Sequence, residues 1–372
     1  MPDASPEPKP ASSLVRRVLG APESGLVLVI LLMMLGLTVL GGTKEKRVRD
    51  DRTGEWTKVP VNRFLDVENL VLVAKDASFI AIMAVGMTAV IVIGGIDLSV
   101  GSIYALAALV GAMALRALQG HWLGVPPGGE VTSAGGAPLW AALPVGLGVC
   151  CLVGAACGAA NGSLVVGLRV HPFIITLGTM AALRGVVFVV TGGLSISGLP
   201  ESFGAGLFKA EVAGVYPVPL LVMLGVACAG HLVLTRLVLG RQAFGVGGNE
   251  TAARYAGIRV GMVKVIVHTL CGLLAGLSAC VYLGYYAAFE PNAGSGYELS
   301  VIAATVIGGA SLSGGRGSAL GAVLGALLIQ LITNAMIILD IDSSYTSIVM
   351  GAAIVIAVVM DQTKARLSSR KG

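Results

Sequence analysis

A single carboxylate, Asp97, stands inside the glycine-rich apolar stretch "VIGGIDLSVGSIYALAALVGA". An ionised group in such a stretch costs several kcal/mol unless it is paired or hydrated, so it is a functional candidate by default. Gly94, Gly95 and Gly101 permit an irregular backbone, which a membrane tolerates only where protein or a water-filled cavity surrounds it. Two interpretations stay open. Asp97 is a polar element of a solute pathway, or Asp97 or Ser99 caps the following helix.

The segment "RVHPFIITLGTMAALRGVVFVVTGG" places polar side chains on a second apolar stretch. Pro172 suits a first helical turn, Thr176 and Thr179 follow it, and Arg184 comes about three turns later. Hydroxyls and a guanidinium on one helix would suit a path for a polyol. The alternative is that the threonines bond their own backbone and that Arg184 has a structural partner such as Asp97.

The elements that must carry these residues are membrane-spanning helices. Of 372 residues, 55% are hydrophobic and only 12% are charged, and the mean hydropathy is +0.88. This apolar surface exceeds what a soluble core of this length can hide. Ten stretches approach the roughly 20 apolar residues that a span needs. They are residues 25–40, 70–93, 98–118, 139–168, 172–191, 216–239, 262–286, 299–312, 317–339 and 345–360. We expect an all-α polytopic transmembrane bundle of about ten helices, some of them broken or short.

Charged residues at the ends of these stretches predict the organisation of the chain. We expect a cytosolic tail at 1–24, a transmembrane domain at 25–361 and a basic cytosolic tail at 362–372. Within the domain, 41–69 is a charged outward loop and 240–262 a cytosolic segment. With ten spans and the N-terminus inside, most Lys and Arg fall on the cytosolic side, as the positive-inside rule requires. The outward loop is the exception, but its Asp and Glu nearly match its Lys and Arg.

The sequence contains an internal repeat. A shift of 214 positions lays "GGIDLSVGSIYALAALVGA" over "GGASLSGGRGSALGAVLGA", with ten of nineteen positions identical. The shared order Gly-Gly-x-x-Leu-Ser-x-Gly indicates duplication. Many transporters build a central pathway from duplicated halves whose broken helices meet near the midplane.

The most polar cytosolic segment, "LGRQAFGVGGNETAARYAGIRVGMVK", predicts a short helix. Asn249 or Thr251 can cap the helix, Ala252 and Ala253 favour it, and Gly257 ends it. Small residues on a short amphipathic helix suit close docking of a partner protein.

Several chemistries are excluded or disfavoured by what the sequence contains. No GxxxxGK[ST] motif occurs, so any use of ATP must come from another subunit, and we expect no cofactor in this chain. The six cysteines lie in apolar segments without CxxC or histidine spacing, so we expect packing residues and no metal site. A serine protease built on Ser311 or Ser313 is disfavoured, because both repeat copies keep Leu-Ser-x-Gly whereas catalysis needs one serine. We therefore expect no catalytic residue.

Six ordered blocks between residues 69 and 362 resemble the sugar ABC-importer permeases of the ribose/xylose/arabinose type. They are "GGIDLSVGS", "HPFIITLGTM", "TGG", "GGNETAARYAGI", "PNAGSGYEL" and "VIGGASLSGGRGSALGA". The resemblance implies a multi-pass subunit of the bacterial cytoplasmic (inner) membrane that pairs with a second copy of itself. It also implies a soluble binding protein that delivers a monosaccharide or related polyol and a separate ABC ATPase that drives import. No nucleic-acid partner is implied.

The resemblance and the polar residues above together define candidate sites. The residues matching the segment that contacts the ATPase are Gly248, Asn249, Glu250, Ala252, Ala253 and Gly257. The candidates for the substrate pathway are Asp97, Ser99, Asn161, Phe173, Thr176, Thr179, Arg184, Glu298 and Asn334. The chain departs from the pattern at His171, where a second proline is usual, at Ser300, where an acidic residue is common, and in its long outward loop.

A proton-coupled secondary transporter is the alternative function. Asp97, Glu290 or Glu298 would then carry the proton. The cytosolic segment discriminates between the two classes, because a secondary transporter has no ATPase to engage. It favours the permease.

Overall fold

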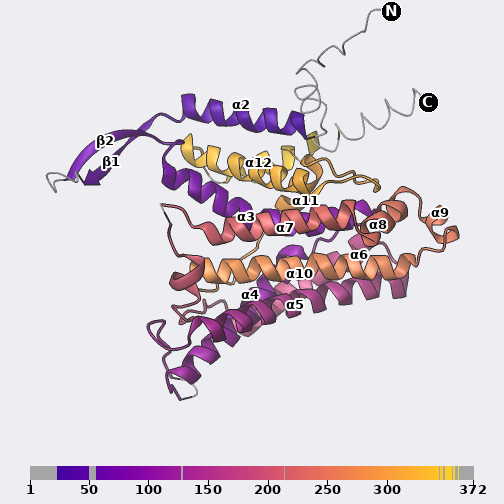
Figure 1. Ribbon diagram of the computed structural model, residues 1–372, viewed down its shortest axis with the longest axis horizontal. Coiled ribbons are helices and arrows are strands. Elements are labelled where there is room, and N and C mark those ends of the chain that lie inside the picture. Colours follow the sequence, from indigo (N-terminus) through magenta and orange to yellow (C-terminus); the bar gives the residue numbers. More distant parts are fainter. Residues whose placement is uncertain are drawn as a thin grey trace, which may run out of the picture.

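Apolar helices and one two-stranded sheet make up the computed structural model, which describes residues 23–49, 56–126, 129–212, 214–342, 344–346, 348–353, 355–356 and 359. Most of the long helices run along the long axis of the molecule (Figure 1). In chain order the elements are α2 (Ser24–Leu40), β1 (Thr43–Arg49), β2 (Trp56–Asn62), α3 (Val67–Val92), α4 (Val100–Trp122), α5 (Leu139–Leu168), α6 (Pro172–Thr191), the π-helical turn η1 (Gly204–Phe208), α7 (Pro217–Thr235), α8 (Val238–Gly248), α9 (Glu250–Tyr255), α10 (Val260–Tyr286), α11 (Tyr297–Ile307) and α12 (Ala319–Ile338).

The predicted helical membrane bundle is confirmed. Among the described residues, seven helices are long and apolar enough to cross a membrane, namely α3, α4, α5, α6, α7, α10 and α12. The stretch predicted at 299–312 forms only the 11-residue α11, which is about 16 Å long and too short to cross alone. Gly296, with φ 77°, precedes α11 and Gly308 ends it. The stretch at 345–360 lies partly outside the described residues, as do nearly all of the first tail and the whole of the last.

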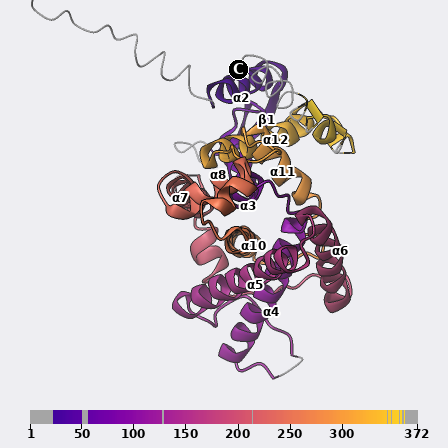
Figure 2. The ribbon, with the colours of Figure 1, turned by 90° about the vertical axis from the view of Figure 1, so that its right-hand side faces the viewer.

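α10 lies at the centre of the bundle (Figure 2), with α4 and α5 on one side and α3 and α7 on the other. Glycines allow α5 and α10 to approach closely. A Cβ atom added to Gly154 would collide with the carbonyl oxygen of Gly272, and one added to Gly158 would collide with that of His268. Small residues at a spacing of four are how membrane helices bring their backbones together, so this pair forms a rigid centre.

The sheet and the α8–α9 pair lie at opposite ends of the bundle (Figure 1). α2 begins at the end that carries α8 and α9, and α3 begins at the end that carries the sheet. The segments predicted as an outward loop and as a cytosolic segment are therefore at opposite ends. Their assignment to the two sides of a membrane stays a prediction.

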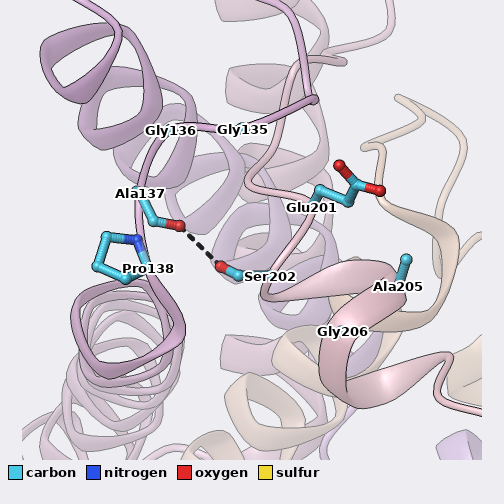
Figure 3. Close-up of a pocket in the computed structure, with 8 residues that line it drawn as sticks. All are labelled: Gly135, Gly136, Ala137, Pro138, Glu201, Ser202, Ala205 and Gly206. Atoms are coloured by element: carbon cyan, nitrogen blue, oxygen red, sulfur yellow. Dashed lines mark hydrogen bonds between the residues drawn. The ribbon is translucent and has the colours of Figure 1, made fainter.

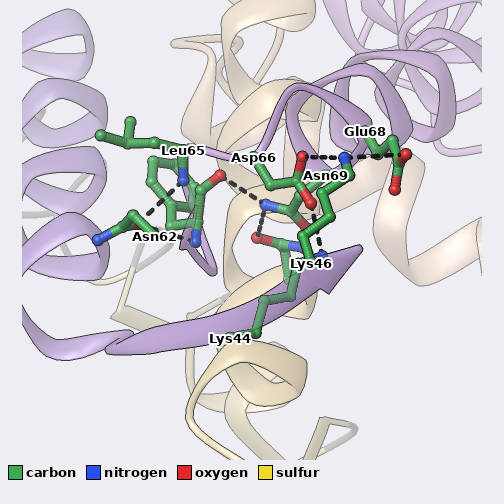
Figure 4. A network of polar contacts seen from close by, with 9 residues as sticks. Lys44, Lys46, Asn62, Leu65, Asp66, Glu68 and Asn69 are labelled. Carbon is green, nitrogen blue, oxygen red and sulfur yellow. Dashed lines mark hydrogen bonds and ion pairs between the residues drawn. The ribbon is translucent and has the colours of Figure 1, made fainter. Parts of the chain in front are cut away.

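Residues 41–69 are not a simple loop, as the sequence led us to expect, but contain an antiparallel hairpin in which Thr43 pairs with Asn62. Alternation of charged residues with threonine and valine suits an exposed two-stranded ribbon. Asp66 anchors the hairpin (Figure 4): its carboxylate oxygens lie 2.6 Å from Lys44 Nζ and 2.8 Å from Lys46 Nζ. Lys44 and Lys46 lower the pKa of Asp66 to about 2.

Candidate functional site

Two glycine-rich turns occupy corresponding places in the internal repeat. Residues 93–99, here called the first junction, join α3 to α4, and residues 308–318, the second junction, join α11 to α12. Gly94 has a φ of 77° and Gly309 a φ of 96°, which side chains other than glycine rarely adopt. Each copy of the sequence repeat is therefore a helix–turn–helix unit, but the glycine of positive φ lies one position later in the second copy, because Gly94 aligns with Gly308, whose φ is -66°.

Asp97 is fully buried in the first junction and organises its polar contacts. Its Oδ1 accepts hydrogen bonds from the Ser99 backbone N–H at 2.9 Å and from the Ser99 hydroxyl at 2.5 Å. Asn161 Nδ2 of α5 donates to Ser99 Oγ at 2.7 Å. Ser99 is the residue that caps α4 but its side chain makes no capping bond, and Asp97 Oδ2 has no hydrogen-bond partner among the described residues. Three of the predicted pathway residues thus form one buried chain of contacts that links α4 to α5.

The threonines of α6 differ in what they contact. Thr176 is fully buried, and its hydroxyl lies 3.2 Å from the carbonyl oxygen of Ile96 in the first junction. The hydroxyl of Thr179 bonds only the backbone of its own helix, at the carbonyls of Ile175 and Thr176. The own-backbone interpretation is therefore right for Thr179, whereas Thr176 also joins the first junction.

Arg184 does not pair with Asp97, so that expectation was wrong. Its guanidinium donates to the carbonyl oxygen of Ala293 at 2.8 Å and to that of Gly101 at 3.5 Å. Gly101 also packs against Glu298: a Cβ atom added to Gly101 would lie 2.6 Å from Glu298 Oε2. Arg184 and Glu298 therefore lie around one contact, between the start of α4 and the segment that leads into α11.

Two predicted pathway residues lie apart from these contacts. Asn334 Nδ2 donates to Asn69 Oδ1 at 2.7 Å, and Asn69 Nδ2 lies 3.3 Å from Asn334 Oδ1. This amide pair ties α12 to α3 near the sheet (Figure 4 labels Asn69). Phe173 is 43% exposed on the first turn of α6. The family resemblance led us to group these residues with Asp97, but the helices that carry them separate them.

Two of the three departures from the family pattern, His171 and Ser300, have local explanations. His171 caps α6, because its Nδ1 accepts from the Phe173 backbone N–H at 3.3 Å next to Pro172 at the first helical position. Ser300 Oγ donates to the carbonyl oxygen of Gly296 at 3.3 Å. Both side chains act on the backbone of their own helix.

Lys75 and Asp76 are polar groups of the membrane bundle that the sequence reasoning missed. Lys75 is 1% exposed on α3, and its Nζ lies 2.7 Å from Asp76 Oδ1 and 2.8 Å from the Tyr286 hydroxyl. The signal was present, because two adjacent charges interrupt an apolar stretch predicted to span a membrane. They escaped notice because they lie close to the polar end of that stretch.

The predicted short helix is confirmed as α9. Asn249 caps it, with Oδ1 accepting from the Ala252 backbone N–H at 2.9 Å. Glu250 accepts from Lys264 at 2.8 Å and from Arg254 at 2.6 Å, and these contacts lower the pKa of Glu250. Gly257 follows the helix with a φ of 81°, as expected of a residue that ends it.

The exposed face of α9 differs from the expected one. Ala253 is 4% exposed and packs against the bundle, so it is not free to enter a partner's groove. Ala252 is exposed, and Gly248 has open space where a side chain would stand. Tyr255, which the sequence reasoning passed over, is 90% exposed and is the large apolar side chain that α9 presents outward.

Through Gly247, α8 touches the second junction and Val92, the last residue of α3 before the first junction. The Gly315 backbone N–H of the second junction donates to the carbonyl oxygen of Val92 at 2.9 Å. A Cβ atom added to Gly247 would collide with that same Val92 oxygen and would lie 2.7 Å from Gly315 N. The helix that precedes α9 is therefore in direct backbone contact with the ends of both repeat units.

An open depression of about 540 Å³ lies elsewhere, between the α4–α5 connection and η1 (Figure 3). Its wall is closed where Ser202 Oγ donates to the carbonyl oxygen of Ala137 at 2.8 Å. Buried Gln119 holds the connection in place, bonding the carbonyl oxygen of Thr132 and the backbone N–H of Ala137. None of the predicted pathway residues lines this depression.

Comparison with known proteins places the chain from residue 69 to residue 358 in one family. The family model described as the permease component of the branched-chain amino acid transport system matches residues 69–358. The chain is 39% identical over 308 residues to the ribose import permease protein RbsC of Escherichia coli K12, covering 81% of this chain and 88% of that protein. It is 37% identical over 299 residues to the D-allose transport system permease protein AlsC of the same strain, covering 80% and 85%.

A third relative is the autoinducer 2 import system permease protein LsrC of Enterobacter sp. 638, 32% identical over 299 residues, covering 80% of each chain. No solved structure matches the chain. The family model begins at Asn69 and so takes in both junctions and the α8–α9 pair, but not the hairpin. The chain therefore belongs to the family of transport-system permease components.

Proposed function

We propose that this chain is the membrane-spanning permease subunit of an ATP-driven importer for a monosaccharide or a related polyol. The names of the relatives, which include ribose and D-allose permeases, support this substrate class. The observation that carries the proposal is the contact of α8 with the second junction and with Val92, which leads into the first junction, because it gives an external motor a direct route to the interior. A proton-coupled transporter has no use for such a route.

The partners follow from this role. A separate ABC ATPase binds ATP and engages α9, a soluble binding protein delivers the sugar at the end that carries the hairpin, and a second copy of the chain completes the pathway. The position of the capped helix α9 at the end of the bundle, with Tyr255 90% exposed, supports docking there. The chain itself contributes shape and movement.

The bacterial cytoplasmic membrane is the proposed location, with both termini in the cytosol. The α9 end carries Arg241, Arg254, Arg259 and Lys264 close together in sequence. Cytoplasmic loops hold an excess of Lys and Arg, so this end is the cytosolic one. The hairpin then faces the binding protein.

Mechanistically, the ATPase subunits close and separate, and α9 moves with them. α8 moves together with α9. Its Gly247 contact then displaces Val92 at the end of α3 and Gly315 in the second junction at the same time. Because a packed glycine contact cannot absorb such a displacement, the movement reaches Asp97 and the Gly101 contact. The pathway between the two copies then opens alternately to each side.

Reconstitution tests the proposal. Purified chain is placed in liposomes with and without its ATPase, with D-ribose-loaded binding protein outside. We expect concentrative uptake only when the ATPase and ATP are both present. Sustained uptake by the chain alone, driven by a proton gradient, would contradict the proposal and favour a secondary transporter.

A further inference from the structure

Four tyrosine rings form a continuous row from the surface of the bundle into its interior. Tyr286, at the end of α10, is 48% exposed. Its ring centroid lies 5.0 Å from that of Tyr282, which lies 5.6 Å from Tyr104 of α4, which in turn lies 5.4 Å from Tyr297 of α11. Tyr104 is fully buried. This row, the tyrosine ladder, thus joins three helices and runs from the hairpin end toward the first junction.

A buried ion pair stands beside the exposed end of the ladder. Lys75 Nζ donates to the Tyr286 hydroxyl and lies 4.8 Å from the Tyr286 ring centroid, while Asp76 pairs with the same ammonium group. Lys75 lies eight residues into α3, about 12 Å along the helix. The Asp76 side chain is 27% exposed. Charged residues inside a membrane helix face the bundle interior or a water-filled cavity and mark substrate paths.

The inner end of the ladder holds polar atoms without partners. Neither the Tyr104 hydroxyl nor Glu298 Oε2 has a hydrogen-bond partner among the described residues. The Tyr104 ring and Glu298 Oε2 both lie beside the contact between Gly101 and Gly294, because a Cβ atom added to Gly294 would lie 2.7 Å from Tyr104 Cδ1 and one on Gly101 would lie 2.6 Å from Glu298 Oε2. A buried polar group left unpaired destabilises the fold, so such groups call for another role.

An aromatic belt at the membrane surface does not explain this arrangement. Belt residues sit at the headgroup level with the polar tip in water. Tyr286 fits that description, but Tyr104 is fully buried and its hydroxyl points to no partner. The ladder therefore has a polar inner end that a belt would not need.

We propose that the tyrosine ladder binds the polyol in the outer half of the pathway, with Tyr104 as its innermost contact. This inference rests on the proposed function. A polyol carries hydroxyl groups that both donate and accept, so one of them can satisfy the buried Tyr104 hydroxyl. Aromatic walls with a few placed polar groups are typical of small-molecule sites. The rings touch in this structure, so the polyol enters when α4, α10 and α11 separate.

The variant Tyr104→Phe separates this role from packing. It keeps the ring and removes a buried hydroxyl that has no partner, so a packing role predicts unchanged or higher thermal stability and unchanged uptake. If the ladder binds the polyol, we expect unchanged or higher stability together with a loss of uptake. At subsaturating D-ribose, uptake should fall about three- to tenfold, the effect of one lost hydrogen bond. Tyr345→Phe, at an exposed tyrosine outside the ladder, is the matched control and should keep wild-type uptake.

The measurement uses the full transporter with its ATPase and binding protein. Wild-type uptake in Tyr104→Phe would overturn the ladder while leaving the proposed function intact. Absence of ATP-driven uptake by the wild-type protein would contradict the proposed function and this inference with it. Should Tyr104→Phe fail to fold, Tyr282→Cys in a background with the six native cysteines replaced serves instead. We expect a membrane-impermeant maleimide to label it and D-ribose to slow the labelling; labelling that the sugar does not affect would overturn the ladder.

Discussion

The two junctions are copies of one sequence motif, but they make different hydrogen bonds. In the first junction, side chains make the contacts: Asp97 bonds Ser99, which bonds Asn161 across to α5. In the second, the Gly315 backbone N–H bonds the carbonyl oxygen of Val92, and the Ser318 hydroxyl accepts from the Gly321 N–H to cap α12. Position 97 corresponds to Ser311 in the repeat, so only the first copy carries a carboxylate at this position.

This difference indicates a division of labour. Polar side chains in the interior can contact a solute, whereas close backbone contacts at glycine transmit displacement without slack. We therefore assign the lining of the pathway to the first junction and the transfer of movement to the second, which meets α8 at Gly247.

The largest effect among the pathway residues is expected at Asp97. Asp97→Leu leaves the buried Ser99 N–H without its acceptor, at a cost of about 1–3 kcal/mol, so we expect uptake to fall about tenfold or more. Asp97→Asn keeps an oxygen at Oδ1 and should retain substantial uptake with little change in its pH dependence. Equal loss in both variants, with normal insertion and ATPase binding, would show that the charge itself is required.

A smaller effect is expected on α6, where two threonines provide a matched pair. Thr176→Val removes the hydroxyl that bonds the Ile96 carbonyl in the first junction. We expect the first junction to lose about 1 kcal/mol of stabilisation and uptake to fall several-fold. Thr179→Val removes only bonds within its own helix and should leave uptake near the wild-type level. Uptake assays on both variants at matched expression decide this. Equal effects of the two variants would show that the contact between α6 and the first junction does not contribute to uptake.

The smallest effect on uptake is expected at the hairpin, far from both junctions. The pKa of Asp66 in the folded protein is about 2, below its ordinary value of 3.8. The stabilisation that ionised Asp66 gives the hairpin is therefore complete above pH 3.8 and is lost as the pH falls toward 2. We expect Trp56 fluorescence, in a Trp122→Phe, Trp140→Phe background, to change over that range. Asp66→Asn should abolish the transition and change uptake by less than about twofold. A large loss of uptake would give the hairpin a part in transport.

Features set by neighbouring residues were predictable from the sequence. The cap at Asn249, the stop at Gly257 and the start of α6 at Pro172 depend on side chains within a few positions, and the structure confirms all three. The apolar stretches likewise became helices, because a membrane helix satisfies its own backbone.

Features set by contacts between distant segments were not predictable. Arg184 bonds backbone at Ala293, more than a hundred positions away, and no spacing rule points there. Asn334 was grouped with Asp97 by polarity, but its partner is Asn69. Ala253 was expected to face a partner, because helical signals indicate that α9 exists but do not indicate which side faces the bundle. Only the packing of α10 beside α3 brings Lys75 to Tyr286.

The central claim, that α8 drives both junctions, is tested most directly by the ratio of D-ribose imported to ATP hydrolysed in the same proteoliposomes. Gly247→Ala forces a Cβ atom against the Val92 carbonyl, and Gly245→Ala is its control on the same helix, because the nearest atom there is 3.6 Å away. We predict hydrolysis close to wild type in both variants, with the ratio about tenfold lower in Gly247→Ala alone. A wild-type ratio in Gly247→Ala, with the ATPase bound normally, would contradict the account.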